Sequence, residues 1–173
     1  IVFNYVRDVM MFGNQSVINK FNLIKVLLIL FLILIDQLTK SFIETNFNLY
    51  ESLYINNFFS LTFIVNYGFA FGFLNDPELN QIIIIVIILS VIIYIGILML
   101  INKSKTEGMA FTMITAGAIG NLLDRLLRGY VVDFLDFNIA NYHWPAFNLA
   151  DSYISIGFIV IMINILFRKK FND

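Results

Sequence analysis

Residues 82–101 form an uncharged, apolar run of the length that crosses a lipid bilayer. The run contains no Asp, Glu, Lys or Arg, and about 20 such residues span the hydrocarbon core as a helix. The whole chain is 60% hydrophobic and 13% charged, whereas a soluble domain is about half apolar and about a quarter charged. The sequence therefore predicts an integral membrane protein that is mainly α-helical.

Three further segments have the character of membrane spans, namely residues 21–43, 108–127 and 144–167. In the last of these, Trp144 suits a membrane interface and Pro145 suits the first turn of a helix. We expect residues 21–170 to form a single domain of four transmembrane helices. Residues 1–20 are weakly patterned, and Met10 and Met11 lie just ahead of the first apolar segment. An amphipathic lead, an alternative start and a misplaced start all fit this pattern, and the favoured interpretation is a cytoplasmic extension of little functional weight.

The basic residues predict the orientation of these spans. Cytoplasmic loops of membrane proteins are enriched in Lys and Arg. With four spans, eight of the eleven basic residues fall on one side: Arg7, Lys20, Lys25, Lys103, Lys105, Arg168, Lys169 and Lys170. The segment from residue 45 to residue 81 contains none. Both termini are therefore predicted to be cytoplasmic, which places the polar residues at the ends of the spans on the outer face.

The connection between the first two spans carries two signals. Residues 60–66 alternate and are rich in β-forming residue types, which predicts a short strand. Residues 66–74 combine two glycines with several aromatic residues. This composition indicates either a backbone that approaches another group closely or an interfacial loop with apolar anchors, and the pattern leaves both interpretations open.

A polar cluster ends the third span. Asn121, Asp124 and Arg125 stand at i, i+3 and i+4, so they share one helix face. Gly117 and Gly120 lie near that face and allow a second helix to approach closely. The predicted helix ends at Gly129, and an extended, β-branched run that contains Asp133 follows it.

Charges inside apolar spans are costly and usually functional, although pairing for assembly is the plainer explanation. Asp36 and Lys40 stand at i and i+4 and are expected to pair. Asp124 is expected to pair with its neighbour Arg125. Arg125 also has several donors with which to fasten loops. For these four residues a structural role is the favoured interpretation.

Asp133 and Asp151 differ from these acids because neither has a Lys or Arg within four residues. Desolvation at a membrane interface raises the pKa of such an acid. Two acids placed together would share one proton, so that one could act as a base toward water while the other donates a hydrogen bond to a carbonyl. The hypothesis is that Asp133 and Asp151 form a catalytic pair.

Several other chemistries fit this sequence poorly. It has no cysteine and one histidine, His143, so disulfides, thiol nucleophiles, thiolate metal sites and multi-histidine zinc sites are excluded. No nucleophile elbow or zinc-protease motif is present. Lys40 and Ser41 are adjacent and face different ways on a helix, which disfavours a Ser–Lys dyad. No metal or cofactor is expected, and a net charge of -1 does not indicate nucleic acid as a partner.

Two classes of function compete with an enzyme. Acids within membrane spans also suit a small four-helix transporter or proton-conducting subunit, and a purely structural assembly factor is a further alternative. The depth of the acids in the membrane discriminates between a transporter and an enzyme. A transporter needs acids near the midplane of the membrane, whereas the predicted topology gathers them at one face.

Five short blocks, in order along the chain, resemble the bacterial lipoprotein signal peptidases, which are the type II signal peptidases. The matching residues are Asp36, Gln37 and Lys40; Asn66, Gly68, Ala70, Phe71 and Gly72; Gly117, Ala118, Gly120, Asn121, Asp124 and Arg125; Gly129, Val131, Val132, Asp133 and Phe134; and Phe147, Asn148, Ala150, Asp151 and Ser152. Any one block alone is a weak signal. Together with the predicted topology they are specific.

The resemblance implies a fold of four transmembrane helices with an outward-facing β-sheet cradle and a short surface helix. It implies an aspartic endopeptidase without metal, in the bacterial inner membrane and with its site at the outer face. The implied catalytic acids are Asp133 and Asp151. The implied substrate or support residues are Asp36, Lys40, Asn66, Gly68, Asn121, Asp124, Arg125 and Asn148.

The implied partners are prolipoproteins whose cysteine carries diacylglycerol, with cleavage just before that cysteine. Membrane lipid and globomycin-type cyclic peptides are the other expected partners, and the acyl chains are expected in grooves between apolar spans. Phe69 departs from the family pattern, which usually has a small residue there. This difference bears on side-chain preference in the substrate and not on the reaction.

Overall fold

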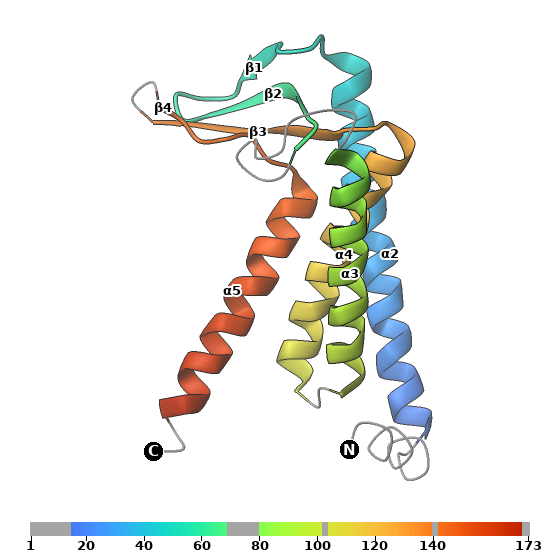
Figure 1. The fold of residues 1–173 in the computed structure, drawn as a ribbon. Coiled ribbons are helices and arrows are strands. Elements are labelled where there is room, and N and C mark those ends of the chain that lie inside the picture. Colours follow the sequence, from blue (N-terminus) through green and yellow to red (C-terminus); the bar gives the residue numbers. More distant parts are fainter. Residues whose placement is uncertain (1–14, 69–79, 102–103, 140–141, 171–173) are drawn as a thin grey trace.

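The computed structural model describes residues 15–68, 80–101, 104–139 and 142–170, and it consists of a helical bundle with a β-sheet at one end (Figure 1). The helices are α2 (Gln15–Asn46), α3 (Asn80–Ile101), α4 (Lys105–Leu127) and α5 (Leu149–Lys170). The strands are β1 (Ser52–Tyr54), β2 (Phe59–Asn66), β3 (Val131–Ile139) and β4 (Tyr142–His143).

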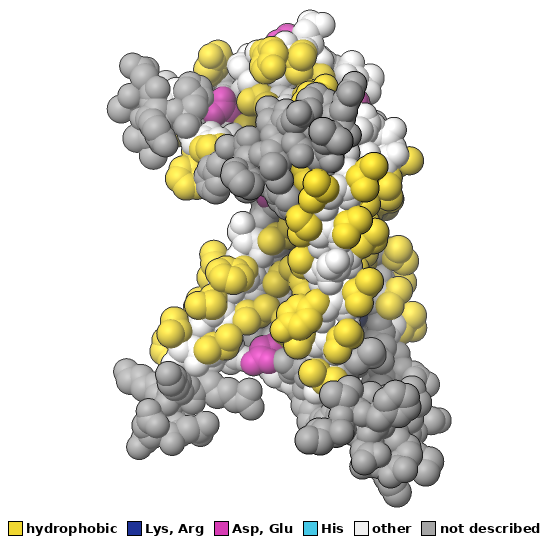
Figure 2. Space-filling view, in the orientation of Figure 1, with side chains coloured by type: hydrophobic (Ala, Val, Ile, Leu, Met, Phe, Trp, Pro, Cys, Tyr) yellow, Lys and Arg dark blue, Asp and Glu magenta, His cyan; other side chains and the backbone are white. Residues whose placement is uncertain are grey.

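Three helices of the described chain are long and apolar enough to cross a membrane, with candidate spans Leu23–Asn46, Gln81–Met99 and Leu149–Phe167. Hydrophobic side chains cover much of the helical surface in Figure 2. The chain is therefore a multi-pass membrane protein. The helix that contains the first candidate span begins before the predicted span, because α2 already includes residues 15–20, which had been assigned to the extension.

The third expected span, residues 108–127, is found as helix α4, but its composition does not place it among the three candidates. Charged Glu107, Asp124 and Arg125 interrupt it, and all of them are buried. Helix α4 packs against α2, α3 and α5. A helix that its neighbours shield from lipid needs less apolar surface than one that faces the bilayer, which explains this difference from the other helices.

The sheet has the antiparallel strand order β1-β2-β3-β4. Strand β2 confirms the strand predicted at residues 60–66, and the extended run that contains Asp133 is β3. A small apolar core joins the sheet to the end of α2: Ile43 packs with Phe63, Val132 and Phe134. This contact fixes β3 over one end of the bundle, with Asp133 opposite Ile64 on β2.

The start of the last span was predicted wrongly. Helix α5 begins at Leu149 rather than at residue 144, and Pro145 lies before the helix. The backbone of Phe147 is hydrogen-bonded to that of Leu135 on β3, with N···O distances of 2.8 and 3.2 Å. This pairing keeps the segment extended until Asn148, where the helix can start.

Glycines shape two junctions near this end of the bundle. Gly129, predicted to end a helix, has φ +80, a conformation that residues with a Cβ adopt at a cost, and it turns the chain from α4 into β3. At Gly117, an added Cβ would lie 2.3 Å from the carbonyl oxygen of Ala150. The close approach of a second helix, predicted from the small residues, is therefore found between α4 and α5.

Some sequence-based expectations fall on residues outside the described part of the chain. They concern Met10 and Met11, Phe69 and the glycine- and aromatic-rich residues that follow it. Within the described ranges, no element corresponds to the short surface helix that the family resemblance implies.

Candidate active site

Asp133 lies on β3 with its side chain buried, at 2% exposure. Two amide groups donate to it: Asn66 Nδ2 lies 3.0 Å from Oδ2, and Asn148 Nδ2 lies 2.7 Å from Oδ1. Asn66 also accepts a hydrogen bond from the backbone N–H of Gly68, at 3.0 Å. The partners of this carboxyl therefore come from the end of β2 and the start of α5, far apart in the sequence.

Asp151 lies in the first turn of α5, where it closes a reciprocal cap with Asn148. The backbone N–H of Asp151 donates to Asn148 Oδ1 at 3.0 Å, and the backbone N–H of Asn148 donates to Asp151 Oδ2 at 3.3 Å. This is the capping-box arrangement that satisfies free N–H groups at a helix start. Asn121 Nδ2 donates to the other carboxyl oxygen at 2.8 Å.

Asn148 connects the two acids. Its side chain is fully buried, its carbonyl caps the backbone of Asp151, and its Nδ2 reaches Asp133. The same Nδ2 lies 3.2 Å from Asn121 Oδ1 and 3.3 Å from the Val132 carbonyl. One amide thus positions both carboxyl groups, and the structure brings Asp133 and Asp151 into a single hydrogen-bonded cluster.

The environment of Asp133 favours its protonated form. Burial is the main cause and the charge of Asp151 is the second, and together they raise the pKa of Asp133 to about 7. The hydrogen bonds from Asn66 and Asn148 act in the opposite direction, because they stabilise the carboxylate. A buried acid that titrates near neutral pH beside a second acid is suited to proton transfer.

A buried ionic cluster lies beside the two acids. Lys40 Nζ is 2.8 Å from both Asp36 Oδ2 and Asp124 Oδ2, and all three side chains are at most 1% exposed. Asp36 Oδ1 also accepts a hydrogen bond from the backbone N–H of Ala150 at 2.9 Å. The predicted pairing of Asp36 with Lys40 is therefore found, and the cluster ties α2 to α4 and to the start of α5.

The predicted pairing of Asp124 with Arg125 is wrong. Asp124 is bound by Lys40 and by Arg128 Nη1, which lies 2.6 Å from its Oδ1. Gln37 Nε2 also donates to it, at 2.9 Å. Adjacent residues point in different directions on a helix, whereas Arg128 stands at i+4 from Asp124 and so lies on the same face.

Arg125 instead holds the chain that follows β2. Its guanidinium donates to the carbonyls of Tyr67 and Gly68 and to Gln81 Oε1. Gln81 Nε2 donates to the Tyr67 carbonyl as well. Arg125 does fasten loop backbone, as its donors suggested, and the segment that it fastens is the one that follows Asn66.

Sequence reasoning assigned no role in the site to three side chains beside this cluster, Gln37, Glu44 and Arg128. Arg128 Nε lies 3.0 Å from Glu44 Oε2, and Tyr130 donates to Glu44 Oε1 at 2.7 Å. This hydrogen bond is the main cause that raises the pKa of Tyr130 to about 12. The i+4 spacing of Asp124 and Arg128 was the signal that could have revealed part of this network.

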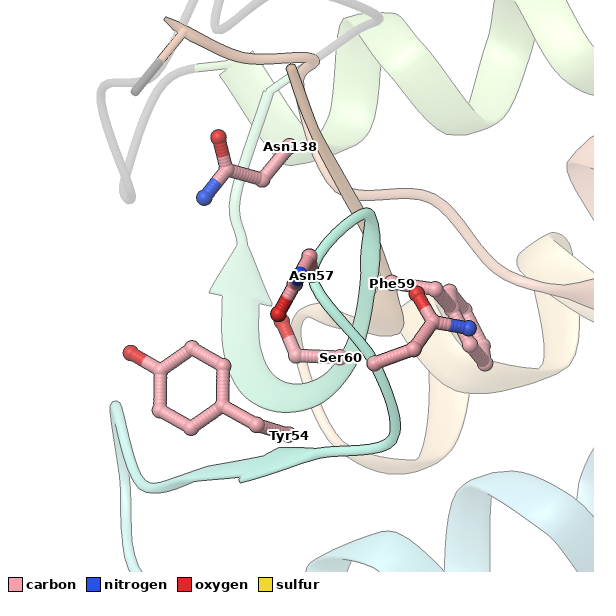
Figure 3. A pocket seen from close by; sticks show the side chains of 6 residues that line it. Tyr54, Asn57, Phe59, Ser60 and Asn138 are labelled. Atoms are coloured by element: carbon pink, nitrogen blue, oxygen red, sulfur yellow. The ribbon is translucent and has the colours of Figure 1, made fainter. Parts of the chain in front are cut away.

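Figure 3 shows a hollow of about 470 Å³ where β2 begins and β3 ends. The register of β2 with β3 places it at the far end of the sheet from Asp133. Its lining residues are Tyr54, Asn56, Asn57, Phe59, Ser60 and Asn138. None of them is Asp, Glu, His, Lys or Arg, so this hollow is not the catalytic candidate. Nor does any group of three or more His, Cys, Asp or Glu side chains in the described ranges have the proximity needed to hold a metal ion.

The candidate acids lie where the sheet meets the ends of the helices (Figure 1). The sequence model of the family described as Signal peptidase (SPase) II matches residues 28–167. The chain belongs to the signal peptidase II family. It is therefore a membrane peptidase of the aspartic class.

Curated relatives support the same family. A lipoprotein signal peptidase of Francisella tularensis subsp. mediasiatica is 40% identical over 148 residues, which cover 83% of this chain and 92% of that protein. Another, from Desulforapulum autotrophicum, is 41% identical over 145 residues, or 80% of this chain and 88% of the relative.

Solved structures agree with the fold. One bacterial membrane enzyme has a TM-score of 0.78 and 32% sequence identity, and the match covers 86% of this chain and 91% of the other. A second has a TM-score of 0.72 and 34% identity, with 82% and 92% covered. The signal peptidase II family thus accounts for nearly the whole described molecule.

Proposed function

We propose that this protein removes the signal peptide from prolipoproteins whose cysteine carries diacylglycerol, and that it cleaves just before that cysteine. The observation that supports the proposal most directly is the pairing of Asp133 and Asp151 through Asn148 at the sheet end of the bundle. Homologues named lipoprotein signal peptidase indicate the class of substrate.

The two acids divide the chemistry between them. The charged carboxylate accepts a proton from water, whose oxygen attacks the scissile carbonyl carbon, while the protonated acid donates to the carbonyl oxygen. In the resulting tetrahedral species the C–N bond breaks, and the amine leaves with the proton that water had given up. The remaining proton returns to the acid that donated it, so the pair is ready for another cycle.

Asp36, Lys40, Asn121, Asp124 and Asn148 act as supports in this proposal. Their mutual hydrogen bonds and ion pairs order the ends of α2, α4 and α5 around the acids. Asn66, Gly68 and Arg125 hold the end of β2 against Asp133. Pre-organised groups of this kind reduce the reorganisation that a reaction needs.

The proposed topology places both termini in the cytoplasm, with α4 as a fourth span and the acids at the outer face of the inner membrane. The start of α2 and the end of α5 lie at the end of the bundle opposite the sheet (Figure 1). A lipidated substrate brings its cleaved bond to the interface. Burial of its acyl chains contributes about 0.8 kcal/mol per CH₂, so recognition of peptide sequence can be modest.

The test is cleavage of a diacylglyceryl prolipoprotein by the purified protein in detergent, with and without globomycin, a ligand expected at the same site. Asp133→Asn and Asp151→Asn are each expected to abolish cleavage, because either change removes a proton-transfer group, while the protein still folds. Product is measured by mass spectrometry, and folding by thermal unfolding.

Asp136→Asn is the matched control. Asp136 is a second buried acid on β3 and accepts hydrogen bonds from Ser60 and Thr62 at 3.2 and 3.1 Å. This variant is expected to keep its activity. Near wild-type turnover in Asp133→Asn or Asp151→Asn would show that the pair is assigned wrongly and would make Asp124 and Asp36 the next candidates. If the protein were a transporter, neither substitution would affect prolipoprotein processing in cells.

A further inference from the structure

The side-chain amide of Asn121 lies between the ionic cluster and the candidate catalytic pair. Its Oδ1 accepts from Lys40 Nζ at 2.9 Å and from Asn148 Nδ2 at 3.2 Å. Its Nδ2 donates to Asp151 Oδ1 at 2.8 Å. The oxygen of this amide therefore faces donors, and its NH₂ group faces an acceptor.

The ammonium group of Lys40 leaves only one orientation for this amide. A lysine side chain has three donors and no acceptor, so only the oxygen of Asn121 can face it. Lys40 is fully buried, with Asp36 and Asp124 as its other partners. Since these contacts fix the position of Nζ, the NH₂ group of Asn121 is directed at Asp151.

We propose that Lys40 is a positioning residue that acts through Asn121 to keep Asp151 as the charged member of the pair, an inference that rests on the proposed function. An amide N–H directed at a carboxyl oxygen stabilises the carboxylate. If the amide were reversed, its oxygen would face Asp151, which would then have to hold a proton in order to make a hydrogen bond. Lys40, together with the weaker contact from Asn148 Nδ2 to the same oxygen, thereby determines which form of Asp151 the site accommodates.

The helix dipole and the nearby cations favour the same division of roles. Asp151 lies at the start of α5, where the helix dipole stabilises negative charge. The cations whose charge acts on it are Lys40 on α2 and Arg125 on α4, and the facing acid is Asp133 on β3. Asp133 is at 2% exposure and its direct partners are the neutral amides of Asn66 and Asn148. Asp151 is thus the base toward water, and Asp133 is the acid that donates to the carbonyl.

The main test variant is the double substitution Lys40→Met with Asp36→Asn. Lys40→Met alone would leave Asp36 and Asp124 with one cation fewer in a buried cluster, a change that can prevent folding. The double variant removes one cation and one anion, and Asp124 keeps its ion pair with Arg128. The measurement is the pH dependence of kcat/KM on a diacylglyceryl prolipoprotein.

The acidic limb of that profile reports the group that must lose its proton. In the double variant this limb is expected to move to higher pH by roughly one unit, which is the lower end of the shift in pKa that a nearby opposite charge produces. Asp36→Asn alone keeps Lys40 and is expected to move the limb to lower pH or not at all. Arg128→Met removes the other cation that binds Asp124, does not contact Asn121, and is expected to leave the limb in place.

An acidic limb at the wild-type pH in a folded double variant would overturn the proposal and leave Lys40 a purely structural role. If the double variant does not cleave, the infrared band of the protonated Asp151 carboxyl, assigned by its loss in Asp151→Asn, is followed against pH. Titration at the wild-type pH would overturn the proposal in that case too. Failure of the wild-type protein to cleave any prolipoprotein would contradict the proposed function instead.

Discussion

The proton held by Asp133 has a consequence for folding that is separate from catalysis. The pKa of this carboxyl is about 7 in the folded protein and about 3.9 in an unfolded chain. Between these values the native state binds a proton that the unfolded state has already released. By linkage, the contribution of Asp133 to stability is fully present below about pH 4 and is lost as pH rises to about 7.

The variant Asp133→Asn has no titrating group at position 133, and this provides a test at the residue scale. The melting temperature of the variant minus that of the wild type is expected to become more positive between pH 5 and pH 8, because only the wild type incurs the cost of charging a buried carboxyl. The measurement is thermal unfolding in detergent at both pH values, with Asp136→Asn as the control. A difference that stays constant with pH would contradict the raised pKa.

Individual residues also show how far the sequence could predict the site. Asp133 and Asp151 were predicted as a pair because neither has a basic neighbour, and the structure places both in one cluster through Asn148. Arg125 was predicted wrongly as the partner of Asp124, because the prediction used only their adjacency in the sequence and ignored the direction of side chains on a helix. The bonds from Asn66 to Asp133 and from Gln37 to Asp124 join distant segments, and no local pattern encodes them.

At the scale of helices and strands, the sequence predicted the elements that depend on short-range patterns of apolar and polar residues. The uncharged run at residues 82–101 corresponds to α3, and the alternating residues correspond to β2. The start of α5 could not be predicted, because Pro145 suits both a first helical turn and the extended segment before one. The choice depends on the pairing of Phe147 with Leu135, a contact made across the fold.

The packing of α4 on α5 gives a prediction at this scale. At Gly117 an added Cβ would lie 2.3 Å from Ala150 O and 2.8 Å from the side chain of Ile154. Gly117→Ala must therefore push α5 and Asp151 away from Asn121. We expect a loss of roughly 1–3 kcal/mol in unfolding free energy, together with a large loss of activity.

Gly96→Ala in α3 is the matched control, because an added Cβ there would meet nothing within 4 Å. Alanine is the better helix former, so this variant is expected to be as stable as the wild type or more stable, by up to about 1 kcal/mol. The two variants are compared by thermal unfolding and by the cleavage assay. Equal stability and activity in both would mean that α4 and α5 do not pack as closely as described.

At the scale of the whole molecule, the proposed topology can be tested by labelling. The sequence contains no cysteine, so each introduced cysteine gives an unambiguous signal. Tyr54→Cys, at an exposed position next to the β1–β2 connection, is expected to react with an impermeant thiol reagent added to intact cells. Thr106→Cys, exposed in the first turn of α4, is expected to react only after the membrane is permeabilised. The reverse pattern would invert the orientation.

The cap that Asn148 and Asp151 form at the start of α5 also bears on when the protein becomes active during its own synthesis. Helices α2, α3 and α4 and strand β3 all precede this cap in the chain. Asp133 is therefore synthesised before Asp151, and Asp151 takes its position only once the first turn of the last helix has formed. A nascent or truncated chain that ends before α5 has only one acid of the proposed pair, so under the proposed mechanism hydrolytic activity is expected to begin only when the final helix is in place.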